Sequence, residues 1–106
     1  MPGISASIIA QLKSATTQTV FNPISPGTAD TEFSQALPNK TKMLIIKSRD
    51  PRARIQYTLT SGESGTKYVT IPIGTERILT FIDLSSATLY LQVNKSSTVI
   101  EIEAWN

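Results

Sequence analysis

The feature that most constrains this chain is a strict alternation of apolar and polar residues in short segments after residue 40. In the segment 88–93, two leucines and a valine occupy every second position. A repeat of two residues is typical of a β-strand with one buried face, because successive side chains point to opposite sides of a sheet. This alternation, or a short apolar run, marks six predicted strands: 42–48, 54–60, 67–73, 77–84, 88–93 and 98–105.

Turn residues separate these segments, and the strand starts follow one another at about ten to twelve residues, the rhythm of a sandwich or small barrel. Asp50-Pro51 and Ser85-Ser86 are two such turns, and the glycine-containing segment 61–65 reads as a hairpin loop. No segment after residue 40 has a helical period. We therefore predict a single all-β domain, an antiparallel β-sandwich of six to eight strands with jelly-roll or Greek-key connections.

The alternation also predicts which side chains face the core. The run of apolar residues in 42–48 predicts a strand buried on both faces. In the later strands the residues expected to point inward are listed here: Ile55, Tyr57, Leu59, Val69, Ile71, Ile73, Leu89, Leu91, Val93, Ile100, Ile102 and Ala104. In the segment 77–84, Ile78, Ile82 and Leu84 alternate with Leu79 and Phe81, which leaves its inward face open. Trp105 is expected to close one end of the sandwich.

The first 39 residues have a different composition, rich in Ser, Thr, Ala and Gln and holding four of the six prolines. Pro23 and Pro26 interrupt any regular element there. We predict an N-terminal arm over residues 1–39 that packs on a partner, followed by the sandwich over 40–106. The alternative is an edge strand with loops, folded back on the same domain, and 31–37 is a candidate seventh strand. The apolar contact residues expected on the arm are Ile4, Ile8, Ile9, Leu12, Phe21 and Ile24.

The residue inventory argues against catalysis. The chain has no histidine and no cysteine, which removes the usual nucleophile–base pairs and the common zinc, copper and haem ligands. Glu101 and Glu103 share one strand face, and we interpret them as a solvated stripe paired with cross-strand cations. We expect no catalytic site, no cofactor site and no metal site.

Basic residues crowd one stretch of the chain, where Lys40, Lys42, Lys47, Arg49, Arg52 and Arg54 face a single acid, Asp50. The cluster is either a solvated hairpin tip or a contact site for an acidic protein surface. A nucleic acid partner is disfavoured, because the net charge is only +2 and no aromatic residues interleave with the cluster. Arg49, Arg52 and Arg54 are the candidate contact residues.

Three segments resemble small virion proteins of tailed bacteriophages, of the head decoration or cement type. They are 68–74 (YVTIPIG), the stretch from Asp83-Leu84 through 89–92 (LYLQ), and the ending 99–105 (VIEIEAW). The resemblance covers residues 41–106. It implies a β-sandwich that sits on an assembled capsid as a homo-oligomer, with no enzyme activity and no cofactor.

From this resemblance we expect a non-enzymatic structural protein in the virion, bound to the major capsid protein or another virion protein. The first ten residues carry no export signal pattern, and no apolar run is long enough to span a bilayer, so we expect assembly in the host cytoplasm and no membrane contact. The alternative function is a carbohydrate-binding module of a tail or fibre. Its stacking platform would be Tyr68 and Tyr90, which the alternation places on outward faces.

Overall fold

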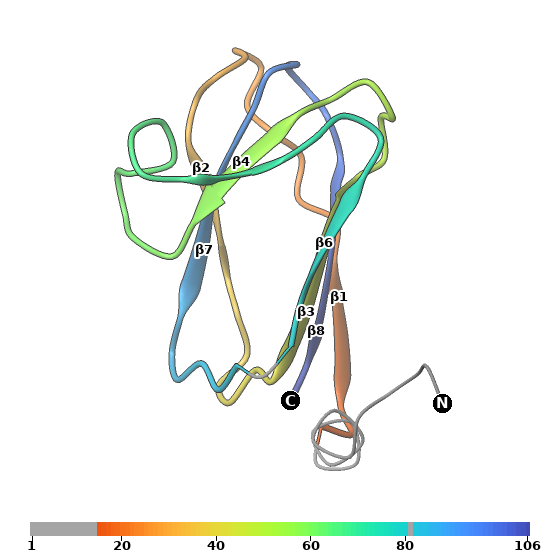
Figure 1. Cartoon of the computed structure of the whole chain (residues 1–106), viewed down its shortest axis with the longest axis vertical. Coiled ribbons are helices and arrows are strands. Elements are labelled where there is room, and N and C mark those ends of the chain that lie inside the picture. Colours follow the sequence, from red (N-terminus) through yellow and green to blue (C-terminus); the bar gives the residue numbers. More distant parts are fainter. Residues whose placement is uncertain (1–14, 81) are drawn as a thin grey trace.

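The computed structural model of the chain describes residues 15–80 and 82–106. In these residues eight strands form two four-stranded antiparallel sheets packed face to face (Figure 1). The predicted all-β sandwich is confirmed, at the upper end of the predicted strand number. The strands are β1 (Gln18–Phe21), β2 (Phe33–Ala36), β3 (Met43–Ser48), β4 (Ile55–Thr58), β5 (Val69–Ile71), β6 (Glu76–Leu79), β7 (Thr88–Val93) and β8 (Ile100–Trp105).

The strand order is β1-β8-β3-β6 in one sheet and β2-β7-β4-β5 in the other. Consecutive strands cross from one sheet to the other except at β4 and β5, which pair as a hairpin across the 59–68 loop. This is the order of an eight-stranded jelly roll, one of the two connection patterns that the sequence predicted. The first and last strands meet in the first sheet, where β1 pairs with β8.

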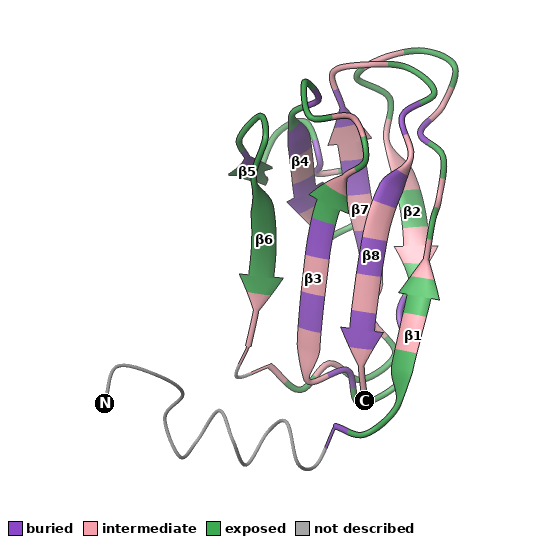
Figure 2. Ribbon diagram, turned by 90° about the vertical axis from the view of Figure 1, so that its right-hand side faces the viewer, coloured by how far each residue is buried: buried purple, intermediate pink, exposed green. Residues whose placement is uncertain are grey.

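The core lies between the sheets and is built from alternate residues of the central strands. Figure 2 shows buried and half-buried positions alternating along β3, β7 and β8. The inward residues predicted for β7 and β8 are confirmed. In β3 only alternate residues are buried, because Leu44 and Ile46 face the core while Met43 and Ile45 are half-buried on the outer face. The prediction of a strand buried on both faces is therefore wrong for β3.

The edge strand β5 departs from the predicted facing, and the structure decides the facing of the edge strand β6, which the sequence left open. Val69 is 46% exposed and Ile73 is 58% exposed, because β5 is a three-residue edge strand and Ile73 lies beyond its end. In β6 the register places Ile78 opposite Ile45 on the outer face, while Leu79 packs against the core. Ile82 and Leu84 still pack against the core from an irregular segment after β6. Leu59, just past β4, is 43% exposed.

The sandwich begins well before residue 40. β1 and β2, both inside the predicted arm, pair with β8 and β7, and Phe21 and Phe33 pack against the core. Ser25 joins the segment between them to the turn before β8, since its hydroxyl accepts a 2.9 Å hydrogen bond from the Thr98 amide. For the described residues, therefore, the alternative of strands folded back on the domain replaces the arm. Four predicted contact residues, Ile4, Ile8, Ile9 and Leu12, lie outside the described residues.

Candidate functional site

The basic residues that the sequence grouped together are separated by β3. Lys40 and Lys42 precede this strand, whereas Arg49, Arg52 and Arg54 follow it, and a strand of six residues spans about 20 Å. The second group is joined by Lys95 from the turn between β7 and β8. We call Arg49, Arg52, Arg54 and Lys95 the basic end of the sandwich.

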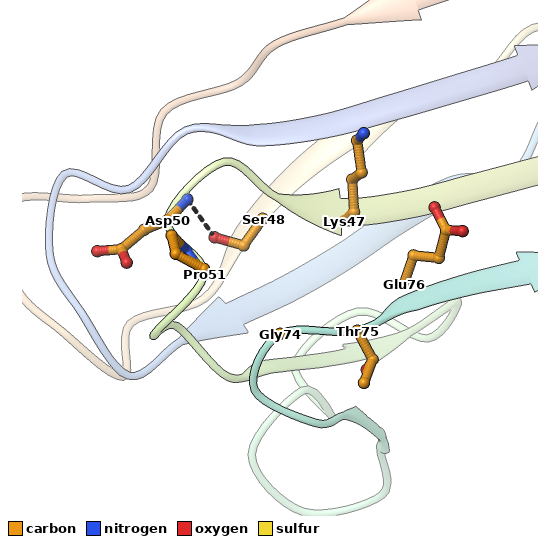
Figure 3. A pocket seen from close by; sticks show the side chains of 7 residues that line it. All are labelled: Lys47, Ser48, Asp50, Pro51, Gly74, Thr75 and Glu76. Carbon is orange, nitrogen blue, oxygen red and sulfur yellow. Dashed lines mark hydrogen bonds between the residues drawn. The ribbon is translucent and has the colours of Figure 1, made fainter.

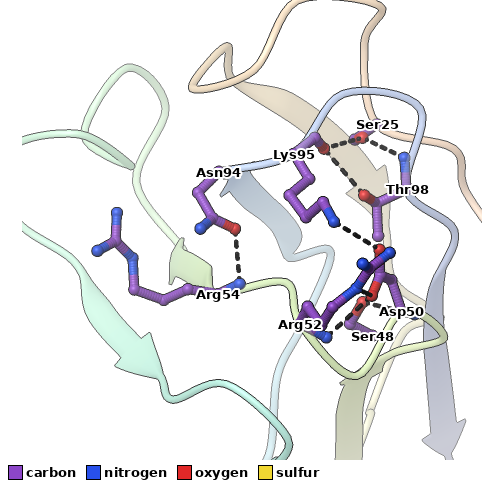
Figure 4. Close-up of polar contacts among 8 residues, drawn as sticks. All are labelled: Ser25, Ser48, Asp50, Arg52, Arg54, Asn94, Lys95 and Thr98. Atoms are coloured by element: carbon purple, nitrogen blue, oxygen red, sulfur yellow. Dashed lines mark hydrogen bonds and ion pairs between the residues drawn. The ribbon is translucent and has the colours of Figure 1, made fainter.

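Asp50 organises the basic end. Its carboxylate lies 3.4 Å from Arg52 Nε and 3.3 Å from Lys95 Nζ, and it accepts a 2.9 Å hydrogen bond from the Arg52 amide (Figure 4). The backbone hydrogen bond from Arg52, together with the Lys95 ammonium, holds the pKa of Asp50 below its ordinary value. Asp50 thus stays charged and orients two cations whose side chains remain open to solvent.

The other two cations of the basic end differ in their partners. Arg49 lies 3.7 Å from the Glu101 carboxylate, which Lys47 also approaches at 3.8 Å. Arg54 is positioned only through its backbone, whose amide donates to Asn94 Oδ1 at 2.7 Å. Its guanidinium points away from Asp50 (Figure 4) and has no hydrogen bond or ion pair with any described residue. Four cations therefore lie at the same end as Asp50, while Glu101 is shared between Arg49 and Lys47, so the basic end keeps a net positive charge.

An exposed apolar side chain lies next to the basic end. Ile24 is 65% exposed and forms an isolated β-bridge with Val99, whose carbonyl also accepts the Arg49 amide at 2.9 Å. Partly buried hydrogen bonds hold this arrangement, because Ser25 and Thr98 both donate from their hydroxyls to the Lys95 carbonyl. The structure therefore brings together Ile24, Arg49 and Arg52 from the predicted contact set.

Phe21, in contrast, is turned into the sandwich and does not belong to this surface. Lys95 was not among the candidate contact residues, since it is separated by 45 positions from the aspartate that it contacts. A contact of that range depends on the packing of the two turns. Nothing in the local sequence around Lys95 signals it.

A recess of about 480 Å³ adjoins the basic end (Figure 3). It lies between the turn after β3 and the turn before β6, and its lining includes Lys47, Asp50 and Glu76. Most of its lining side chains are polar, whereas small-molecule pockets are mainly apolar. The recess therefore fits a polar side chain of a partner better than an enclosed cofactor.

The outer face of the β2-β7-β4-β5 sheet is uncharged. Its outward residues in the paired strands carry only hydroxyl, amide, methyl or phenol groups, and they are Ser34, Ala36, Gln56, Thr58, Thr70, Thr88, Tyr90 and Gln92. Tyr90 lies opposite Thr58. Continuing the β4–β5 register by one residue places Tyr68 on the other side of Thr58, about 10 Å from Tyr90 across two strand spacings. Tyr68 is 41% exposed and Tyr90 is half-buried.

The carboxylates of β8 have structural partners. Glu101 is paired with Lys47 across the strands, as the sequence predicted, and Glu103 accepts hydrogen bonds from Gln18 Nε2 at 2.8 Å and Trp105 Nε1 at 2.7 Å. Trp105 is therefore on the outer face of the sheet, and its predicted role as an end plug is wrong. Among residues 15–80 and 82–106, no group of three acidic side chains is placed to hold a metal ion.

The described part of the chain contains no helix that is long and apolar enough to cross a bilayer. No family model, no curated protein and no solved structure matches this chain.

Proposed function

We propose that this chain is a non-enzymatic structural protein of a virion, a decoration or cement protein that binds and stabilises the head of a tailed bacteriophage. The observation that carries this proposal is the basic end. It places Ile24, an exposed apolar side chain, beside cations from two further segments of the chain. The jelly-roll strand order is compatible with this role, since capsid proteins are among those built on it, although a fold alone does not specify a function.

The composition of the basic end suits contact with an acidic protein surface. Arg52 and Arg54 present guanidinium groups to solvent, and a guanidinium can bind a carboxylate through two parallel hydrogen bonds. Complementary charge of this kind guides and orients association. Many copies on a lattice would then give stable decoration from contacts that are individually weak, because effective concentration is high.

The test is co-sedimentation of the purified chain with heads assembled without it. We expect saturable binding that weakens as salt rises from 50 to 500 mM, because screening reduces exposed charge interactions. The double variant Arg52→Glu/Arg54→Glu should lose at least tenfold in affinity. Lys67→Glu, a charge reversal in the β4–β5 loop, serves as the control and should bind like the wild type. Absence of binding by the wild type would refute the proposal, and binding to DNA in place of heads would assign the basic end to nucleic acid.

A second candidate function is carbohydrate binding, which the row of Tyr68, Thr58 and Tyr90 favours. Aromatic rings flanked by hydroxyl and amide groups on an uncharged face suit a neutral glycan. A glycan array is the direct measurement. Specific binding that disappears in both Tyr68→Ala and Tyr90→Ala, and persists in Tyr57→Phe, would support this function over decoration.

A further inference from the structure

The outer face of the β1-β8-β3-β6 sheet carries apolar side chains where a solvated face is ordinarily polar. The register places Val20, Glu103, Ile45 and Ile78 in one row across all four strands. Val20 is 59% exposed and Ile78 is 50% exposed. Three of the four residues in this row are apolar, and Glu103 lies between Val20 and Ile45. Clustered exposed apolar residues mark an interaction site more often than isolated ones do.

A shallow depression of about 150 Å³ lies within this face, between β1, β8 and β3. Val20 and Ile45 give it apolar walls, and Glu101 and Glu103 give it carboxylates. Lys47 also lines it and is paired with Glu101, so Glu103 is the carboxylate without a cation beside it in the described chain. Apolar walls with carboxylates at the rim fit a lysine side chain, whose methylene stem packs on apolar surface while its ammonium reaches an acid. Trp105 and Gln18 hold the Glu103 carboxylate in place at this rim.

The charge of this outer face limits which kind of segment can bind to it. Within the strands it carries Glu76, Glu101 and Glu103 against Lys47, and Arg49 reaches Glu101 from beyond β3, so three acids face two cations. This excess of acid favours a cationic occupant over a second copy of the same face. A segment that combines apolar residues with a lysine and no acid would be complementary.

Residues 1–14 of this same chain have that composition. They contain Ile4, Ile8, Ile9 and Leu12, followed by Lys13, and no aspartate or glutamate. Where the described chain begins, Ala15 is 2% exposed, and Thr17 exchanges backbone hydrogen bonds of 2.9 and 3.0 Å with Asn106. The chain is thus anchored just before β1, which is an edge strand of this sheet.

We propose that residues 1–14 of one copy dock on the outer face of the β1-β8-β3-β6 sheet of a neighbouring copy, with Lys13 reaching Glu101 and Glu103. This inference rests on the proposed function, because a decoration protein acts as many adjacent copies. In this proposal the basic end and the outer sheet face bind different partners. The basic end contacts the head, and the outer sheet face contacts the next subunit.

Because the chain has no cysteine, disulfide trapping can test this without background. Ile9→Cys and Ile45→Cys proteins, one carrying a size tag, are mixed at concentrations where the wild type is oligomeric and then oxidised. We expect the mixed disulfide in at least tenfold excess over that from Ile9→Cys with Thr88→Cys, which lies on the other outer face. A yield equal to this control, or a wild type that is monomeric at every concentration, would overturn the inference. So would an intramolecular disulfide in the Ile9→Cys/Ile45→Cys double variant.

A second pair of variants tests the outer face of the β1-β8-β3-β6 sheet without changing residues 1–14. Ile78→Asp should lower the fraction of oligomer at least fivefold, whereas Thr88→Asp should leave it unchanged. Ile78 is half-exposed, so its replacement leaves the core intact. Head binding is measured on the same proteins. If the protein binds heads but the mixed disulfide does not form, only the contact between copies is refuted. If the mixed disulfide forms but the protein does not bind heads, only the proposed function is refuted.

Discussion

At the scale of single residues, Glu32 determines how the β4–β5 loop lies. Its carboxylate accepts hydrogen bonds from the Gly62 amide at 2.9 Å and the Ser64 amide at 3.1 Å. Ser64 is 1% exposed, and its hydroxyl oxygen lies 3.3 Å from Gln92 Oε1. The loop is therefore tied to the outer face of the β2-β7-β4-β5 sheet, next to the strand that carries Tyr90.

Glu32 should make the stability of this loop depend on pH. Hydrogen bonding by the Ser64 hydroxyl, and then by the amides of Ser64 and Gly62, lowers the pKa of Glu32 below 4.5. Its stabilising effect is therefore present above about pH 4.5 and is lost as pH falls through the lower folded pKa. Chemical denaturation between pH 7 and pH 3 should show Glu32→Gln less stable than wild type at pH 7, with the difference shrinking in acid. Glu63→Gln is the control, and an equal loss in both variants would contradict the prediction.

Gly74 is required by its backbone conformation in the turn between β5 and β6. Its φ is +75°, which costs a residue with a side chain about 1–2 kcal/mol. A Cβ there would only meet the Pro51 carbonyl oxygen at 3.7 Å, an ordinary contact. We expect Gly74→Ala to lower the free energy of unfolding by about 1–2 kcal/mol in urea denaturation. Gly27→Ala, where φ is not positive and a Cβ meets nothing within 4 Å, should change it little.

At the scale of elements, β1 shows how the first part of the chain belongs to the sandwich. Its four residues pair with β8, and the following segment is joined to the turn before β8 through Ser25 and Thr98. β1 thereby covers an edge of β8 that would otherwise present unpaired backbone groups.

Two truncations should therefore behave differently. Removing residues 2–14 leaves all eight strands, so circular dichroism should remain that of a folded β-protein. Removing residues 2–28 takes away β1, the packing of Phe21 and the Ser25–Thr98 hydrogen bonds. We expect this second protein to unfold at a much lower temperature or to aggregate. Equal melting temperatures for the two truncations would show that β1 is dispensable.

At the scale of the whole molecule, the jelly roll brings together residues that are far apart in the sequence. β1 pairs with β8, β2 with β7 and β3 with β6, and only the β4–β5 hairpin is local. Because the paired strands are far apart in the sequence, long loops must close before these strands can pair, and closing them costs conformational entropy. The fold is therefore expected to form slowly for its size.

Measuring the folding rate tests this expectation of slow folding. Proteins dominated by non-local strand pairing fold in milliseconds to seconds, against microseconds for local topologies. Stopped-flow fluorescence, with Trp105 as the only tryptophan, should give a folding phase in that slower range. Completion of folding within the dead time of mixing would contradict the nested topology. Trp105→Phe identifies the part of the signal that comes from β8.

The sequence predicted the buried residues of strands with strong alternation well, but it did not predict those of the edge strands. β7 and β8 are central strands, each buried on one face, so their period of two appears directly in the sequence. β1 carries threonine and glutamine in an exposed edge position, and its sequence has no such contrast. The facing of β6 could not be predicted from the sequence, because its apolar residues lie on both sides of the strand and only its pairing with β3 distinguishes them.

The sequence by itself determined the all-β class, the central strands and most of the core, because these depend on local alternation and on turn residues. It also identified the excess of cations after β3. Only the tertiary structure decided that the cluster divides across β3, that Lys95 and Ile24 join its second half, and that apolar residues lie on an outer face. These features depend on which turns and strands become neighbours, and that is set by packing between segments far apart in the sequence, such as Gln18 and Glu103, which are 85 residues apart.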